Sequence, residues 1–459
     1  MQGTSTSSGD VCAPLKRKMK FTDMNIDCIE SCLEHLKLDD LLNAAASNKR
    51  LNRAASFIYH RSYSTKLIHL NIVPGNRSLQ FRPNSRIEFC NLMSSLRLLR
   101  CFGNLIKNIL ISYKGVYKIV DDDLDDIGIN NYELTLRAIE YLNEYCTESS
   151  TLIQFNKLKN VPVYLKEQFK HVTKLQMVDC DFTELVENNS FNAIFPRTEE
   201  FFVSITDSIL YPTSSFKFMA NHFPFLERLH IRHSDRYLIE TRSLKQSLTA
   251  AIHLNPQLKQ LTIKQYNSFF DANFLQSVNN SLKNLEFLGL SMDEEFNSKA
   301  NGELIQFKNL KTLEIYIQSS AESFQIPFAI DKLEVLVFAM NVRLTNFSYE
   351  FIEKHPYLTN LTLHAIKHEH AINSRINVSR IANSLPLLEK LKFAMNINIT
   401  IDEILPHCTK FKSLNEMSFC QHGNVEVTAL KPFESIGWSG TVERMSQKTR
   451  INLKRIKSE

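Results

Sequence analysis

The chain has 459 residues, of which 43% are hydrophobic and 22% are charged, with a formal net charge of +5. These fractions are near the average of folded globular proteins, and no apolar run approaches the roughly 20 residues that cross a membrane, so we expect neither a membrane span nor a signal peptide. The nine cysteines include no Cys-x-x-Cys pair, which favours reduced thiols and a cytoplasmic or nuclear location. A charge of +5 over this length is weak support for nucleic-acid binding.

Residues 1–20 are predicted to form a disordered tail, because their first part is rich in Ser, Thr and Gly. Residues 21–63 are predicted to form a small domain of packed helices. Apolar side chains recur there three and four positions apart, at Ile26, Ile29, Leu33 and Leu36 and again at Leu51, Ala54, Ala55 and Ile58. About 40 residues cannot build a generous core, so such a domain is expected to bury its remaining apolar face in a partner.

The helical segment resembles the F-box, in the divergent insect-type form that precedes leucine-rich repeats. Met24 takes the place of the leucine in the usual Leu-Pro pair, and Lys49, Arg50 and Leu51 take the place of the basic-aromatic stretch. The resemblance implies that the helices bind a Skp-type adaptor, and through it a cullin. The implied adaptor-binding residues are Met24, Ile29, Leu33, Leu36, Leu38, Asp40, Leu41 and Leu51. A helical cap for the domain that follows is the alternative interpretation of the same spacing.

Two apolar triplets after the helical segment are interpreted as early, distorted repeats, namely Leu67, Leu70, Ile72 and Ile106, Ile109, Ile111. Five aspartates between residues 121 and 126 are predicted to lie in a solvated loop before a helix over 132–146. A calcium loop that begins at Asp121 would need Gly and Glu where the chain has Asp126 and Tyr132.

One apolar pattern recurs at least nine times between Val172 and Phe419: an apolar residue, two free positions, a second, one free position and a third. The copies begin at residues 172, 198, 226, 258, 285, 310, 333, 358, 388 and 414. The last two apolar positions alternate as in a strand with one buried face, and helical spacing follows between copies. The pattern resembles the leucine-rich repeat. It predicts an α/β solenoid over residues 64–440, with parallel strands on the concave face and helices on the convex face.

Motifs for catalysis are nearly absent from the sequence. Neither G-x-G-x-x-G nor a phosphate-binding G-x-x-x-x-G-K-[ST] motif occurs, so we expect no enzyme activity and no cofactor. Three histidines, His364, His368 and His370, invite a metal-site interpretation, but an exposed turn is favoured because no fourth ligand has a fixed position. The polar, basic residues 441–459 are predicted to form a C-terminal tail.

The free positions of the strands are expected to face the concave side, the usual binding surface of a solenoid. Two zones are predicted there: a basic one around His230, with Arg228, Arg232 and Lys264, and an apolar one with Phe287, Tyr316, Val335 and Val337. Large apolar side chains bordered by charge favour a protein ligand.

The F-box resemblance implies a non-catalytic substrate receptor of a Skp/Cullin/F-box ubiquitin ligase. The helices would bind the adaptor, and the concave face would hold a protein substrate near the transferring enzyme. The alternative is a scaffold or regulator that uses the same solenoid without ubiquitin machinery.

Overall fold

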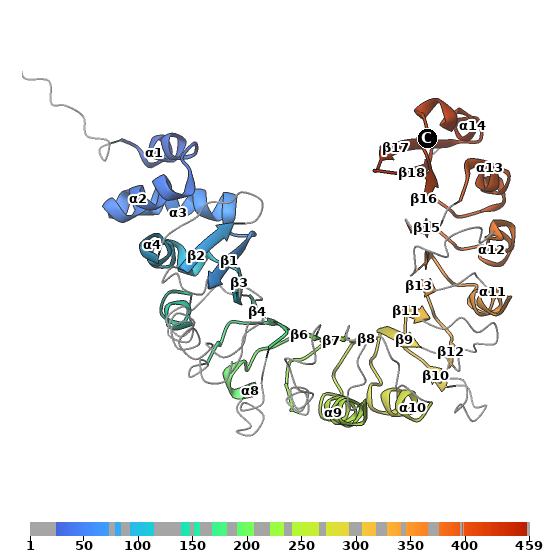
Figure 1. Cartoon of the computed structure of the whole chain (residues 1–459), viewed down its shortest axis with the longest axis horizontal. Helices are drawn as coiled ribbons and strands as arrows, with labels where there is room; N and C mark the ends of the chain where they lie inside the picture. The colour runs from blue at the N-terminus through green and yellow to red at the C-terminus, as the bar shows by residue number, and fades with distance from the viewer. Residues whose placement is uncertain are drawn as a thin grey trace, which may run out of the picture.

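A computed structural model of the chain describes residues 24–72, 79–83, 92–113, 139–146, 151–156, 168–180, 191–205, 221–233, 241–265, 272–292, 305–317, 328–340, 346–365, 376–394, 397 and 399–456. Over these residues the chain forms a horseshoe, with strands along the inner curve and helices outside (Figure 1). The predicted tail 1–20, the aspartates 121–126, His368 and His370 lie outside the described residues.

Three helices open the described chain: α1 (Ile26–Leu33), α2 (Leu38–Ser47) and α3 (Lys49–Tyr63). The side chain of Asn48 accepts a hydrogen bond from the Arg50 backbone N–H and so caps the start of α3. Asp39 and Asp40 occupy the first turn of α2, where the helix dipole favours a negative charge. The helices predicted between residues 21 and 63 therefore form.

Sixteen of the described strands form one sheet, which is parallel over most of its width. Its parallel strands are β1 (Leu67–Ile72), β3 (Asn108–Tyr113), β4 (Leu152–Asn156), β5 (Lys174–Val178), β6 (Glu200–Ile205), β7 (Arg228–His233), β8 (Gln260–Gln265), β9 (Phe287–Met292), β11 (Thr312–Ile317), β13 (Val335–Met340), β14 (Asn360–Ala365), β15 (Lys390–Phe393) and β16 (Glu416–His422). Every copy predicted from residue 172 onward supplies one strand, which begins two residues after the first apolar position.

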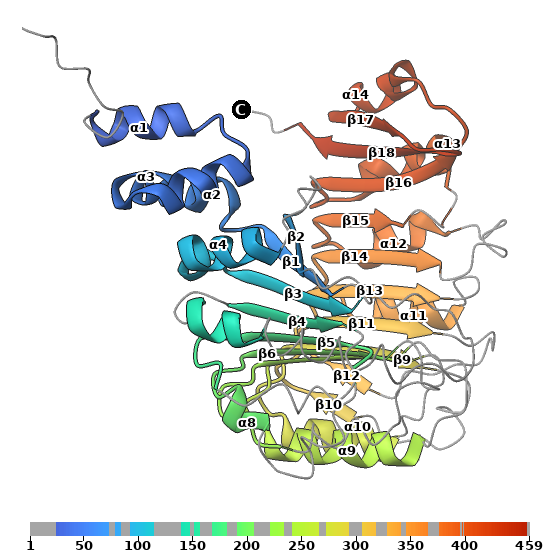
Figure 2. The ribbon, with the colours of Figure 1, turned by 60° about the vertical axis from the view of Figure 1, so that its left-hand side comes forward.

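Successive strands lie side by side in the sheet (Figure 2). Equivalent positions of successive copies are paired, so the apolar residues form continuous rows. Leu229 pairs with Leu261, and Leu261 with Leu288. All three are buried on the side that faces the outer layer. Three buried aliphatic side chains per copy contribute roughly 5–9 kcal/mol as an upper estimate, before the loss of chain entropy. Stacking thus gives each copy a core that it cannot form alone.

The outer layer consists of short helices and turns. They are α4 (Leu92–Phe102), η2 (Gly103–Leu105), α8 (Phe191–Ile194), α9 (Thr241–Leu254), α10 (Ala272–Ser281), α11 (Asn346–Glu353), α12 (Val378–Ser384), α13 (Ile401–Ile404), η6 (Leu405–Lys410), η7 (Val427–Leu430) and α14 (Lys431–Glu434). A separate pair of short parallel strands, β10 (Ile305–Phe307) and β12 (Phe328–Ile330), also occurs. The described part of the predicted helix 132–146 is helical over residues 139–145.

The two ends of the sheet differ from the sequence prediction. The basic C-terminal tail expected from residue 441 is wrong, because this region forms the antiparallel strands β17 (Trp438–Arg444) and β18 (Lys448–Arg455), and β18 pairs with β16. Ile451 and Leu453 alternate with polar residues in β18 and are buried. The opposite end closes with another antiparallel strand, β2 (Leu79–Pro83), on β1.

The first copies also deviate from the predicted pattern. Ile68 pairs with the buried Ile109, so the copy placed at Leu67 begins two residues earlier than expected, and Leu67 pairs with Asn108 on the other face. Strand β4 was not predicted. Its Ile153 and Phe155 are buried, but Ser150 stands where the pattern requires an apolar residue.

The helical region is joined to the sheet by a shared core. Tyr59 of α3 stacks on Phe102 of α4, with 4.5 Å between ring centroids, and on Tyr63 at 5.4 Å. Arg97 of α4 donates a hydrogen bond from Nη1 to Oδ1 of Asn43 in α2 at 2.9 Å. The buried residues of the helices and of the repeats form a single apolar cluster. The helices are therefore packed against the first repeats and not held by a free linker.

Candidate interaction surfaces

The first candidate surface is the helical region, where half of the predicted adaptor-binding residues are internal. Ile29, Leu33, Leu38 and Leu41 are at most 5% exposed. They cannot contact a partner while the three helices are folded, because these helices need them to close their own core. The prediction that these four residues contact an adaptor is therefore corrected. In the structure they form the core of the helical region.

The other four predicted residues remain accessible to different degrees. Met24, Leu36 and Leu51 are partly buried at the edge of the core, and Asp40 is exposed. The sequence interpretation missed Phe57, whose side chain is 54% exposed on α3. Its position could have been found, because it lies outside the apolar stripe that runs from Leu51 to Ile58 on that helix.

The exposed face of α3 is basic. Lys49, Arg50 and Arg53 are all exposed near its start. Nη2 of Arg50 donates a hydrogen bond to the Met24 carbonyl oxygen at 2.7 Å, which holds the entrance to α1 against α3. At the other end Arg61 forms an ion pair with Glu34 of α1. Because its core is filled, the helical region offers a charged surface with a few apolar side chains at its edge.

The second candidate surface is the concave face, where the basic zone proves to be interrupted by carboxylates. Arg228, His230 and Arg232 project from β7 on the side opposite to the buried Leu229. Nη2 of Arg228 lies 3.1 Å from Oε2 of Glu200 on the adjacent β6, and Nζ of Lys174 lies 3.5 Å from the same oxygen. The predicted zone is therefore less positive than its arginines and lysines alone imply.

Lys264 forms a cross-strand contact that spans β9. Its Nζ lies 2.8 Å from the Tyr316 hydroxyl oxygen, 3.2 Å from Oε2 of Glu314 and 4.4 Å from the Tyr316 ring centroid. Gly289 and Ser291 occupy the concave positions of the intervening strand. A Cβ atom at Gly289 would meet Cγ2 of Thr262 at 3.1 Å. A glycine at this position therefore leaves space on the concave side of β9, across which Lys264 reaches Glu314 and Tyr316.

The charge of Lys264 is stabilised by this contact. Burial lowers the pKa of Lys264, but the hydrogen bond to Tyr316 and the carboxylate of Glu314 outweigh burial and raise it above its ordinary value. Tyr316, predicted as part of the apolar zone, thus links that zone to the basic zone. The cation is held in place before any ligand arrives, which lowers the entropic cost of binding.

His230 contributes a polar group to the concave face. Its Nδ1 lies 3.0 Å from Oγ1 of Thr262 on β8. Burial lowers the pKa of His230, so its neutral form is favoured. The positive charge of the basic zone is therefore carried by Arg228, Arg232 and Lys264, and not by this histidine.

The apolar zone is only half accessible. Phe287, Tyr316, Val335 and Val337 are all partly buried on neighbouring strands. They lie on three adjacent strands, because β9 pairs with β11 and β11 with β13, and Thr312 stands between Phe287 and Val335 in the same row. Of the four, Tyr316 contacts Lys264, and each presents less surface than a fully exposed residue would.

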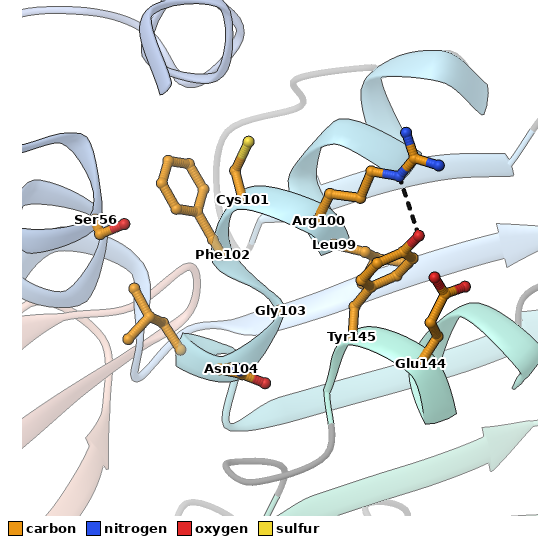
Figure 3. A pocket seen from close by; sticks show the side chains of 10 residues that line it. Ser56, Leu99, Arg100, Cys101, Phe102, Gly103, Asn104, Glu144 and Tyr145 are labelled. Carbon is orange, nitrogen blue, oxygen red and sulfur yellow. Dashed lines mark hydrogen bonds between the residues drawn. The ribbon is translucent and has the colours of Figure 1, made fainter. Parts of the chain in front are cut away.

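A hollow of about 320 Å³ lies where the helical region meets the first repeats (Figure 3). It is lined from α3, α4, η2 and the helix 139–145, and Nε of Arg100 donates to the Tyr145 hydroxyl oxygen at 3.0 Å. Gly103 permits a close approach here, since a Cβ would lie 2.3 Å from the Tyr145 carbonyl oxygen. Burial raises the pKa of the Cys101 thiol, which opposes thiolate chemistry. The helical region and the first repeats are thus closely packed around this hollow.

Neither protein-family models nor curated protein sequences match this chain. Within the described ranges, no three metal-ligating side chains are grouped so that they could hold an ion. No helix in these ranges has both the length and the apolar character needed to cross a bilayer. Function is therefore inferred from the two surfaces and from how the fold joins them.

Proposed function

We propose that the protein is a non-catalytic substrate receptor of a Skp/Cullin/F-box ubiquitin ligase. The edge of the helical region, with Met24, Leu36, Leu51 and Asp40, binds a Skp-type adaptor. The concave face, with Arg228, Arg232 and Lys264 beside Phe287 and its apolar neighbours, binds a protein substrate. The resemblance of the helical segment to the F-box supports the choice of adaptor.

The proposal rests on one observation: the helical region is packed against the first repeats, so the two surfaces keep a fixed relative position. A receptor promotes transfer by holding a substrate at a defined distance from the transferring enzyme, which works only if the two surfaces keep their relative positions. The stacking of Tyr59 on Phe102 and the hydrogen bond from Arg97 to Asn43 provide such a joint. The helices lie at one end of the horseshoe and leave its inner curve open (Figure 1).

The second candidate function is a scaffold or regulator without a ligase role. The burial of Ile29, Leu33, Leu38 and Leu41 favours it, since a helical cap that only protects the end of the sheet would also bury these side chains. Under this alternative the helices stabilise the first repeats, and ligands bind only to the solenoid.

Co-purification of the full chain with a Skp-type adaptor separates the two functions. The full chain is required because the helices share their core with α4. We expect binding by the parent chain and a loss of at least about tenfold for Leu36→Asp, which places a charge in the apolar edge of the interface. Leu387→Asp is the matched control, since Leu387 is 47% exposed and lies among the repeats.

Failure of the parent chain to bind the adaptor would exclude the ligase function. Binding by Leu36→Asp at the parent level, with an unchanged melting temperature, would place the adaptor surface elsewhere. A melting curve of each variant distinguishes loss of the interface from loss of the fold.

A further inference from the structure

The residues directly before each strand form one rim of the solenoid, and this rim contains a hollow of about 480 Å³. Three successive copies line it, through Gln168, Lys170, His171, Pro196, Arg197 and Phe225. These residues precede β5, β6 and β7, so the hollow is separate from the concave face and from the helical region.

The hollow combines positive charge with an exposed aromatic ring. Lys170, His171 and Arg197 are exposed, and none forms an ion pair with a residue in the described part of the chain. Phe225 is 56% exposed, whereas its neighbours Phe223 and Leu226 are buried. The backbone therefore directs one aromatic side chain outward, beside the cations of Lys170 and Arg197, which have no ion-pair partner among the described residues.

Residues next to the lining residues join the adjacent copies by direct contacts. The Phe169 backbone N–H donates to the Ile194 carbonyl oxygen at 2.7 Å, and the Phe169 ring stacks on Phe195 at 5.2 Å. The Glu199 backbone N–H donates to the Thr173 carbonyl oxygen at 2.7 Å. These contacts fix the backbones of adjacent copies to one another, so the attachment points of Lys170 and Arg197 are set by the fold before a ligand binds.

A second hollow farther along the same rim provides an internal comparison. It has a volume of about 460 Å³ and contains four lysines, but Glu286 and Glu334 line it too. Nζ of Lys311 lies 3.7 Å from Oε2 of Glu286. By contrast, none of the described residues that line the first hollow carries a carboxylate. Among the described residues, Glu199 and Glu227 lie close to it along the chain, and Glu227 is paired with Lys259 at 2.7 Å.

We propose that the first hollow binds an acidic segment of a partner protein that also carries an apolar side chain. Carboxylates pair with Lys170 and with Arg197, whose planar guanidinium suits bidentate contacts. The apolar side chain packs on the face of Phe225. The proposal is independent of the ligase function, because a scaffold would present the same rim.

Fluorescence anisotropy of the full chain with a short labelled peptide of alternating Glu and Leu tests this site. We expect saturable binding that weakens as salt is raised, and no binding of the same peptide with Gln in place of Glu. The double variant Lys170→Ser with Arg197→Ser should weaken binding by about tenfold or more, and Phe225→Ser by several-fold. The matched control is Lys308→Ser with Lys332→Ser, which removes the same charge from the second hollow and should leave affinity unchanged.

Equal binding by the rim variant and the control variant would overturn the proposal. So would equal binding of the Gln peptide, or a phosphorylated peptide or single-stranded RNA that binds while the Glu peptide does not. Replacement of the aspartates at 121–126 by Asn tests self-occupancy, and tighter peptide binding by that variant would show that the chain's own acidic run is the occupant. Each variant must melt at the parent temperature, and Lys170→Gln with Arg197→Gln provides a second form if the Ser variant does not fold.

Discussion

The helical region and the repeats use the same kind of apolar spacing, but the spacing has different meanings in the two. In the repeats it recurs many times, and the structure buries Leu229, Leu261 and Leu288 while it leaves Arg228 and its neighbours on the open face. In the helices no apolar position is repeated, and half of the residues predicted to face a partner belong to the core instead. In the repeats, an apolar position that recurs in every copy forms a continuous row across the sheet, so the sequence assigns it to the core. A position in the helices is not repeated, so its spacing alone does not distinguish core from surface.

The largest loss of stability is expected from a change in the core of the helical region. Leu41→Asp places a charge in a fully buried site of α2, so we expect a loss of at least about 3 kcal/mol in the free energy of unfolding. The melting curve of the full chain measures it. Asp40→Asn, one residue away and exposed, should cost no more than about 1 kcal/mol through loss of its charge near the start of α2. An unchanged Leu41→Asp variant would mean that this side chain is not in the core.

The repeats should respond to loss of a buried side chain in the same direction but less strongly. Leu288→Ala creates a cavity in the middle of the sheet without adding a charge, and should cost about 2–5 kcal/mol. Chemical denaturation with two probes, one in the helices and one in the repeats, checks whether both melt together. Coincident transitions are expected because one apolar cluster spans them, and separate transitions would contradict the shared core.

Mild acid should destabilise the repeats through their buried histidines. Burial lowers the pKa of His355 below its ordinary value of 6.5, so the unfolded chain takes up the proton at a higher pH than the folded chain does. Stability is then full above about pH 6.5 and falls below it. Melting temperatures at about pH 7.5 and 5.5 should differ for the parent and differ less for His355→Gln. His35 and His60 of the helical region are exposed, and His60→Gln is the control.

The smallest effect on stability is expected on the concave face. Replacement of Arg228, Arg232 and Lys264 together by Ser should change stability by no more than about 0.5 kcal/mol per site, because these groups are partly solvated and their ion pairs are screened. Capture of the native substrate should nevertheless weaken. Lys311→Ser on the rim is the control for capture. An early melting transition in the triple variant would show that the basic zone has a structural role.

The sequence predicted the repeats well because the pattern is periodic and each copy confirms the next. The prediction from sequence failed for strands whose residues do not follow the repeated pattern. Before β4, Ser150 stands at the first position of the pattern, where an apolar residue is expected. Ile153 and Phe155 alone were therefore not enough to predict the strand. In β18 two buried residues, Ile451 and Leu453, lie among basic ones, and their core is supplied mainly by β16, which is distant in sequence.

The candidate surfaces were predictable only in part, for a similar reason. Alternation placed Arg228 and Lys264 on the open face, but it could not show that Glu200 and Glu314 neutralise part of their charge from neighbouring strands. The rim hollow was not predicted, because Lys170, Arg197 and Phe225 belong to three different copies and become neighbours only when the copies stack.

The antiparallel pair β17 and β18 has a consequence for how much of the chain can be removed. A chain that ends before Trp438 would keep β16, whose Met417 and Phe419 are buried, but would leave its backbone donors and acceptors open along one edge. Open edges pair readily with edges of other molecules, which leads to fibres or precipitates. The last two strands therefore move the edge of the sheet from the largely buried β16 to β17, whose side chains after Trp438 are mostly accessible and include the charged Glu443 and Arg444, and a charged edge strand pairs less readily with other molecules.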